Sequence, residues 1–66
     1  MVNVQLLEEK IKASGMTKVA VCEKAGISRQ VLHKRLQHPN FTVDEVLGLK
    51  RALRLTSSEV NKIFLS

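Results

Sequence analysis

Residues 17–36 read TKVAVCEKAGISRQVLHKRL, and this stretch decides the fold. Gly26 stands between two helical patterns, and glycine turns a chain through a left-handed conformation at a helix end without a side-chain penalty. Ser28 suits the N-cap of the second helix, because its hydroxyl can accept a hydrogen bond from an otherwise unpaired amide. The small residues Cys22 and Ala25 let that helix cross closely over the first. The stretch therefore predicts an angled pair of short helices joined by a tight turn.

Three further helices are expected outside this pair. Apolar residues recur at three- and four-residue spacing over residues 3–13, which is typical of an amphipathic helix. Thr42 with Glu45, and Thr56 with Glu59, each form the T-x-x-E capping box that marks a helix start. Because no stretch reads as a strand, we expect one all-α domain over residues 1–66, a compact bundle of five helices. Its expected core contains Leu7, Ile11, Cys22, Ala25, Ile27, Leu32, Leu36, Phe41, Val46, Leu49, Leu53 and Ile63.

Composition and charge narrow the classes of function. A chain of 66 residues buries only about 60% of its surface, so a pocket that encloses a substrate is not expected. The single Cys22 cannot form an internal disulfide, and no apolar run is long enough to cross a membrane, which indicates a cytoplasmic protein. The net charge is +5, and residues 27–40 contain no acid. This distribution favours a polyanionic partner.

The helix pair resembles the helix-turn-helix of the phage Cro and repressor proteins, the Xre-type DNA-binding family. The residues that carry the resemblance are Thr17, Cys22, Gly26, Ile27, Ser28 and Leu32. The resemblance extends to the end of the chain through FTVDEV and LTSSEVNKIF. This sequence departs from the family pattern at two positions, because the family commonly has Gln in place of Lys18 and Ala in place of Cys22. The resemblance implies a lambda-repressor-like domain that regulates transcription in a phage or prophage, with residues 28–37 as the recognition helix.

The third helix should present its polar side chains to DNA. With Leu32 and Leu36 facing inward, the side chains left outside are Arg29, Gln30, His33 and Lys34. The first turn of a recognition helix meets base edges in the major groove, where Arg can bridge guanine and Gln can bridge adenine. We therefore expect these four residues to contact bases. The alternative is that they are simply solvated surface residues.

Phosphate contacts are expected at the starts of three helices, because helix N-termini attract anions. The candidate residues are Thr17, Lys18, Ser28, Asn40 and Thr42. Ser28 has an equally good alternative role as a cap alone. Arg35 is expected at the rim of the DNA contact.

A twofold dimer is expected, because one helix reads too few base pairs to discriminate well and paired half-sites solve this in the family. The expected interface is Phe64 and Leu65, with dimerisation either in solution or only on DNA. For Phe64 the alternative is that its ring closes the bundle over the first helix.

No pattern indicates catalysis, a metal or a cofactor. His33 and His38 lack the spacing of a zinc site, and Cys22 is better explained as a core residue than as a nucleophile. Two functions therefore remain. One is a regulator that binds an operator in double-stranded DNA; the other is a protein-interaction module of the same fold that binds a repressor or toxin.

Overall fold

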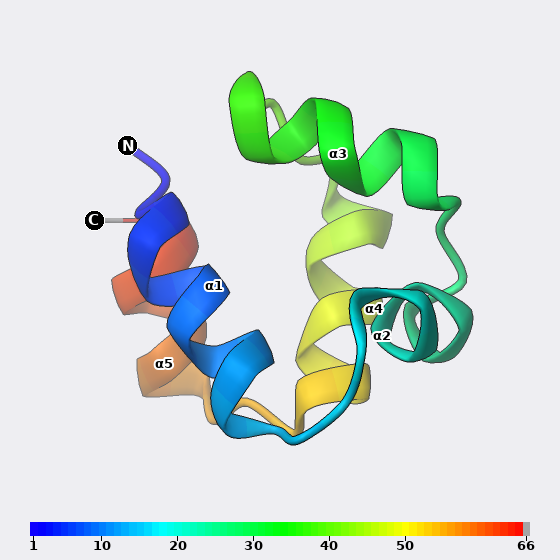
Figure 1. Cartoon of the computed structure of the whole chain (residues 1–66). Helices are drawn as coiled ribbons and strands as arrows, with labels where there is room; N and C mark the ends of the chain where they lie inside the picture. Colours follow the sequence, from blue (N-terminus) through cyan, green and yellow to red (C-terminus); the bar gives the residue numbers. More distant parts are fainter. Residues whose placement is uncertain (66) are drawn as a thin grey trace.

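The computed structural model describes residues 1–65, which form five helices and no strand. In chain order the helices are α1 (Val4–Ala13), α2 (Lys18–Ala25), α3 (Arg29–Gln37), α4 (Val43–Leu53) and α5 (Ser57–Phe64). Figure 1 shows α1 beside α5, α2 against α4, and α3 lying across one end of the other helices. The expected all-α bundle of five helices is confirmed for these residues.

Each helix begins directly after a residue whose side chain accepts a hydrogen bond from the first turn. These N-cap residues are Asn3, Thr17, Ser28, Thr42 and Thr56. Both expected capping boxes are complete, because the carboxylates of Glu45 and Glu59 accept hydrogen bonds from the N-cap amides at 3.0 and 2.8 Å. Local hydrogen bonds therefore fix where all five helices start.

Most of the expected core is buried. The buried members are Leu7, Ile11, Cys22, Ala25, Leu32, Leu49 and Ile63. Five expected core residues are only partly buried: Ile27, Leu36, Phe41, Val46 and Leu53. These five pack against the buried cluster and keep part of their surface exposed, because a bundle this small cannot cover every apolar side chain. Four further hydrophobic residues, outside the expected core, are buried as well, namely Val21, Ala52, Leu55 and Phe64.

The contact between α2 and α4 is the most extensive in the molecule, and it depends on Gly48. A Cβ atom at this position would fall on the carbonyl oxygen of Ala25, at the end of α2. Ala25 is itself small and buried. Two small residues therefore let the backbones of α2 and α4 meet, which places α2, and the turn that follows it, firmly on the bundle.

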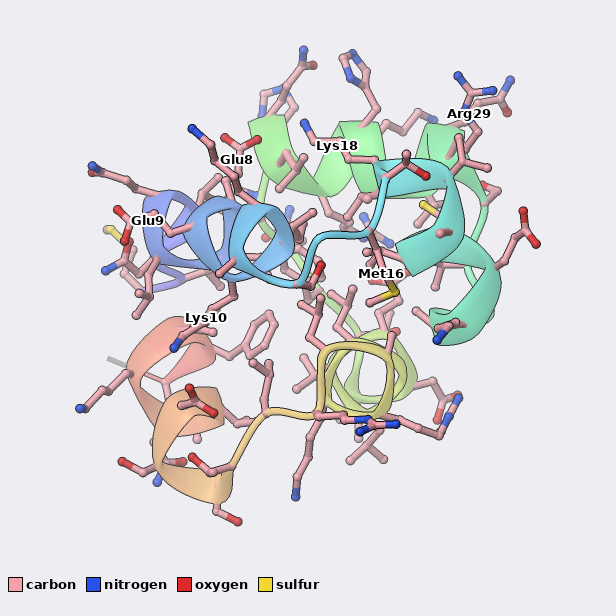
Figure 2. The ribbon with its side chains drawn as sticks, turned by 60° about the horizontal axis from the view of Figure 1, so that its bottom comes forward. Glu8, Glu9, Lys10, Met16, Lys18 and Arg29 are labelled. Carbon is pink, nitrogen blue, oxygen red and sulfur yellow. The ribbon has the colours of Figure 1, made fainter. Side chains whose placement is uncertain are left out.

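The two ends of the chain are tied together. The amide of Asn3 donates a hydrogen bond to the carbonyl of Ile63 at 2.6 Å, and Lys10 of α1 forms an ion pair with Glu59 of α5 at 2.6 Å. Figure 2 shows Lys10 reaching from α1 toward α5. Within residues 1–65 we find no helix with the length and apolar character needed to cross a membrane.

Candidate nucleic-acid interface

The turn between α2 and α3 is built around Gly26. This residue has φ +75°, a left-handed conformation, and a hydrogen bond joins its amide to the carbonyl of Cys22 at 2.9 Å. The next amide, that of Ile27, donates to the same carbonyl at 3.1 Å. The Ser28 hydroxyl then accepts from the amide of Val31 at 3.1 Å and so starts α3. Only two residues, Gly26 and Ile27, separate α2 from the cap of α3, so the position of α2 largely dictates that of α3.

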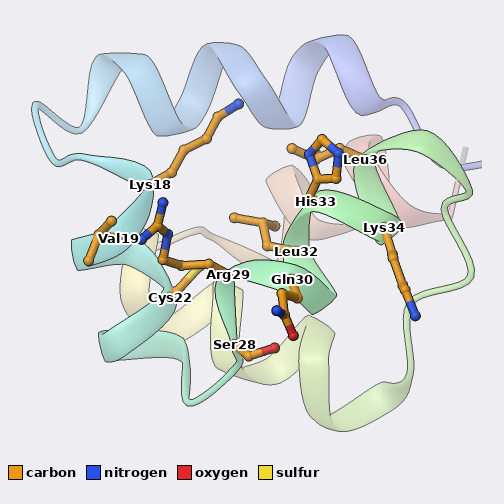
Figure 3. Close-up of a pocket in the computed structure, with 10 residues that line it drawn as sticks. All are labelled: Lys18, Val19, Cys22, Ser28, Arg29, Gln30, Leu32, His33, Lys34 and Leu36. Atoms are coloured by element: carbon orange, nitrogen blue, oxygen red, sulfur yellow. The ribbon is translucent and has the colours of Figure 1, made fainter.

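A groove lies between the start of α2 and the outward side of α3, and we call it the α3 groove (Figure 3). Six of the residues expected to contact DNA line it: Lys18, Ser28, Arg29, Gln30, His33 and Lys34. Its floor is apolar and consists of Val19, Cys22, Leu32 and Leu36. Among the described residues no Asp or Glu lines this groove, although three of its lining residues are Lys or Arg. The groove is therefore a cationic surface over a packed floor.

All four residues expected to contact bases are exposed, whereas Leu32 between them is buried. Arg29 and Gln30 occupy the first turn of α3. Figure 3 shows Arg29 directed toward α2 and the Lys34 side chain extending away from it, at the other end of the groove. His33 lies between them, and the Gln37 amide nitrogen is 3.2 Å from its Nε2, which accepts the hydrogen bond in the tautomer that carries the ring proton on Nδ1.

Lys18 is the one groove cation with an acid close to it. Its Nζ lies 3.1 Å from Oε1 of Glu8 on α1, and about half of each side chain remains exposed. Figure 2 shows the two side chains on the same side of the molecule. Exposed pairs of this kind stabilise a fold by at most about 1 kcal/mol, so Lys18 can exchange Glu8 for another anion at little cost.

Arg35 lies outside the α3 groove and connects α3 to α4. Its Nε and Nη2 donate to the two carboxylate oxygens of Glu45 at 2.8 and 3.3 Å. This hydrogen-bonded guanidinium lowers the pKa of Glu45, with a further contribution from the amide of Thr42. Arg35 therefore links the last turn of α3 to the capping box of α4. This structural role is additional to the position expected for it at the rim of the DNA contact.

Three expected phosphate contacts do not line the α3 groove. Thr17 caps α2 and lies next to the groove residue Lys18, whereas Asn40 and Thr42 follow α3. The amide of Thr42 already donates to Glu45, and its hydroxyl accepts from the Glu45 amide at 3.2 Å. What Thr42 retains for a further contact is its hydroxyl proton.

Cys22 is buried beneath Arg29, on the floor of the groove. Burial raises the pKa of its thiol, and the nearby charge of Arg29 offsets only part of that rise. A protonated, buried thiol is a packing group rather than a reactive one. In residues 1–65 no three His, Cys, Asp or Glu side chains come together as a set of metal ligands.

No protein-family model, curated protein or solved structure gives a significant match to this chain. What the α3 groove does must therefore be inferred from its own geometry and charge.

Sequence reasoning missed the exposed apolar side chains of α4, where Val43 and Leu47 are 74% and 51% exposed. It did expect Val19 or Val21 to be partly exposed, and Val19 is 40% exposed at the α3 groove, whereas Val21 is buried. The signal for α4 was present in the sequence: Val43 and Leu47 are apolar positions left over after its inward face is assigned to other residues.

At the C-terminus, Phe64 is 8% exposed and its ring packs edge-on against the ring of Phe41, with the ring centroids 5.3 Å apart. This geometry favours the bundle-closing alternative for Phe64.

Proposed function

We propose that α2 and α3 form a helix-turn-helix and that the protein is a sequence-specific regulator of transcription, of the Cro or repressor type, which binds double-stranded DNA. The proposal rests on one observation: Arg29 and Gln30 stand exposed on the first turn of α3, beside a groove whose described lining carries cations and no acid. It includes the cytoplasmic location and the phage or prophage role expected from the sequence.

The two side chains suit direct readout of bases. A guanidinium can donate two hydrogen bonds to guanine, at O6 and N7. A carboxamide can donate from its nitrogen to N7 of adenine while its oxygen accepts from the N6 amino group. Their place in the first turn matches the part of a recognition helix that enters the major groove. Lys34, one turn further along, extends the same contact, and His33 adds a donor or an acceptor according to its protonation.

Phosphate contacts would come from the edges of the same groove. Lys18 is half exposed and held only by the exposed carboxylate of Glu8, so a phosphate can displace that partner. Ser28 uses its oxygen as an acceptor for the cap and still has a hydroxyl proton to donate. The N-terminal ends of α2 and α3 carry partial positive charge and would add to the attraction for phosphates.

The test begins with selection of bound sequences from a pool of random duplexes. A DNA-reading protein should enrich one short motif, and its affinity should fall with salt by a slope of about −0.9 per phosphate contact. The Arg29→Ala variant should lose about 1–3 kcal/mol of discrimination at one position of the motif. The Lys18→Ala variant should instead weaken binding to all duplexes alike.

A matched control is Arg51→Ala, which removes one exposed cation from α4, outside the α3 groove. It should lower affinity less than Lys18→Ala and leave the sequence preference unchanged. If Arg29→Ala retains full discrimination, the assignment of α3 as the reading helix is wrong.

One observation favours the second candidate, a protein-interaction module for a repressor or toxin. The exposed apolar residues Val43 and Leu47 lie on a helix other than α3, where a protein partner could dock without touching the α3 groove. This candidate predicts no enriched motif from the random pool and no effect of Arg29→Ala on binding of the partner.

A further inference from the structure

The side chain of Arg35 joins the last turn of α3 to the first turn of α4, and Figure 1 shows the start of α4 next to α3. Its Nε and Nη2 donate to Oε1 and Oε2 of Glu45, so the planar guanidinium meets both oxygens of the carboxylate. This two-point geometry fixes the orientation of the two groups as well as their distance. The side chains of Arg35 and Glu45 are 28% and 12% exposed, whereas the Lys18–Glu8 pair is about half exposed.

We propose that the Arg35–Glu45 pair holds the C-terminal half of α3 at the angle needed to read bases. Arg35 and Glu45 are then positioning residues for sequence recognition, although neither of them lines the α3 groove. The inference rests on the proposed DNA binding. It adds two residues on which the sequence preference depends, one of which is an acid.

Packing alone leaves the last turn of α3 with few restraints. Of its nine residues, which the structure describes in full, only Leu32 is buried, whereas α4 buries three of its eleven. The other apolar residues of α3, Val31 and Leu36, are partly buried. The short turn of Gly26 and Ile27 ties the start of α3 to α2. The pair formed by the last turn therefore supplies a restraint at the end opposite to this turn.

A small tilt of α3 is enough to lose a base contact. His33 lies four residues after Arg29, which is about 6 Å further along the helix axis. A tilt of about 10° about the first turn is within the scatter of helix packing angles and moves the backbone at His33 by about 1 Å. Hydrogen-bond lengths span only about 0.5 Å, and a ring on a short stem cannot make up the difference.

Glu45 is itself held in place, so it can transmit the position of α4 to α3. Its Oε1 also accepts a hydrogen bond from the amide of Thr42 at 3.0 Å, in the capping box that starts α4. The α4 helix in turn meets α2 at the close approach of Gly48 to Ala25. Both ends of α3 are therefore attached to the same pair of packed helices, the first turn through α2 and the last turn through α4.

The alternative role for Arg35 is a direct contact with a phosphate at the rim. In that role Glu45 would only compete for the guanidinium, and removing its charge would tighten binding to every duplex. In the positioning role Glu45 is required, and removing its charge lowers the discrimination between sequences. Replacement of Glu45 therefore separates the two roles by the direction of its effect.

The experiment measures how well Glu45→Gln discriminates the motif selected from the random pool from duplexes with single base changes. Glutamine keeps the capping box, because its oxygen can accept from the amide of Thr42. It removes the charge and replaces one acceptor of Arg35 with an amide nitrogen, which cannot accept. We expect discrimination to fall about five- to tenfold at positions of the motif that Arg29 does not read. At the position that Arg29 reads, and in binding to random duplexes, the change should be less than about twofold.

Arg35→Gln leaves the capping box intact and is the second variant, which decides the matter if Glu45→Gln does not fold. It should lose discrimination at the same positions. The double variant should lose no more than the larger single loss, because both substitutions remove one shared contact. All proteins are compared at a temperature at which urea denaturation shows them to be folded.

The matched control is Glu59→Gln. Glu59 has the same place in the capping box of α5 and forms an ion pair with Lys10 of α1. Its replacement therefore makes the same change in net charge and removes the same kind of pair, but away from α3. Glu59→Gln should discriminate between sequences as well as the parent protein does.

Five results would overturn the inference and leave the proposed function standing. These are full discrimination by Glu45→Gln, an equal loss by Glu59→Gln, an equal loss at the position that Arg29 reads, single losses that multiply in the double variant, and an Arg35→Gln variant that weakens all duplexes alike with a salt slope reduced by about 0.9. Absence of sequence-specific binding by the parent, or full discrimination by Arg29→Ala, would overturn the proposed function, and the inference with it.

Discussion

Replacing Gly48 with Ala tests the packing that holds the candidate interface in place. The new Cβ would fall on the carbonyl oxygen of Ala25, in the last turn of α2. The obstructing atoms belong to the backbone, so no side-chain rotation can make room for the methyl group. The α2 and α4 helices must move apart, and the turn at Gly26 begins immediately after the point of collision.

Two opposing terms set the magnitude. Overpacking costs about 1–3 kcal/mol, and a backbone obstacle places this substitution near the upper end of that range. Alanine recovers about 1 kcal/mol of helix propensity relative to glycine. We therefore expect a net loss of about 2 kcal/mol in the free energy of unfolding. A chain of this length is stable by only about 3–10 kcal/mol, so the variant should melt about 8–16 °C lower.

Urea denaturation followed by far-UV circular dichroism measures the difference directly, with thermal melting as a second readout. The control is Arg51→Ala on the exposed side of α4, which should change the stability by no more than about 0.5 kcal/mol. If Gly48→Ala is as stable as the parent protein, helix propensity outweighs the collision, and the close approach of α2 and α4 does not limit this fold.

Two further predictions concern the end of α4 and the pairing of α1 with α5. Arg54 is the only non-glycine residue with positive φ, +53°, in the part of the chain that the structure describes, so Arg54→Gly should stabilise the fold by about 1 kcal/mol in urea denaturation. An unchanged or lower stability would contradict that conformation. The hydrogen bond from Lys10 lowers the pKa of Glu59 from 4.5 to about 2, so the stabilisation by this carboxylate is fully present above pH 4.5 and is lost as the pH falls through 2. Glu59→Gln should therefore melt below the parent at neutral pH, and the difference between their melting temperatures should shrink between pH 4.5 and 2. A difference that stays constant over this interval would mean that the ion pair does not contribute.

The starts of the helices could be predicted because their signals are local. An N-cap side-chain oxygen accepts a hydrogen bond from the amide three residues later, within the first turn of the helix. Thr17, Ser28 and the two T-x-x-E boxes can therefore be recognised without knowledge of the fold. The left-handed turn at Gly26 is local in the same sense. Arg54 shows the limit of this reasoning, because a left-handed arginine at the end of α4 has no marker in the sequence.

The degree of burial was harder to predict, because it depends on which helices meet. Periodicity assigns Leu36 to an inward face, but it does not reveal that α3 lies at one end of the bundle, where Leu36 remains partly buried. The same reasoning left Val43 and Leu47 unassigned, although they are the exposed apolar residues of α4.

By itself the sequence determined the five helices, their caps, the turn at Gly26 and the acid-free stretch of α3, because each depends on residues within one or two turns of one another. Only the tertiary structure decided which side chains share a surface. It brought Lys18 of α2 to the same groove as Arg29 and Lys34 of α3, and it gathered Val43, Leu47 and Leu65 around a second groove. Both surfaces depend on the angles at which helices pack, and those angles are set by contacts between residues far apart in the chain, such as Gly48 with Ala25.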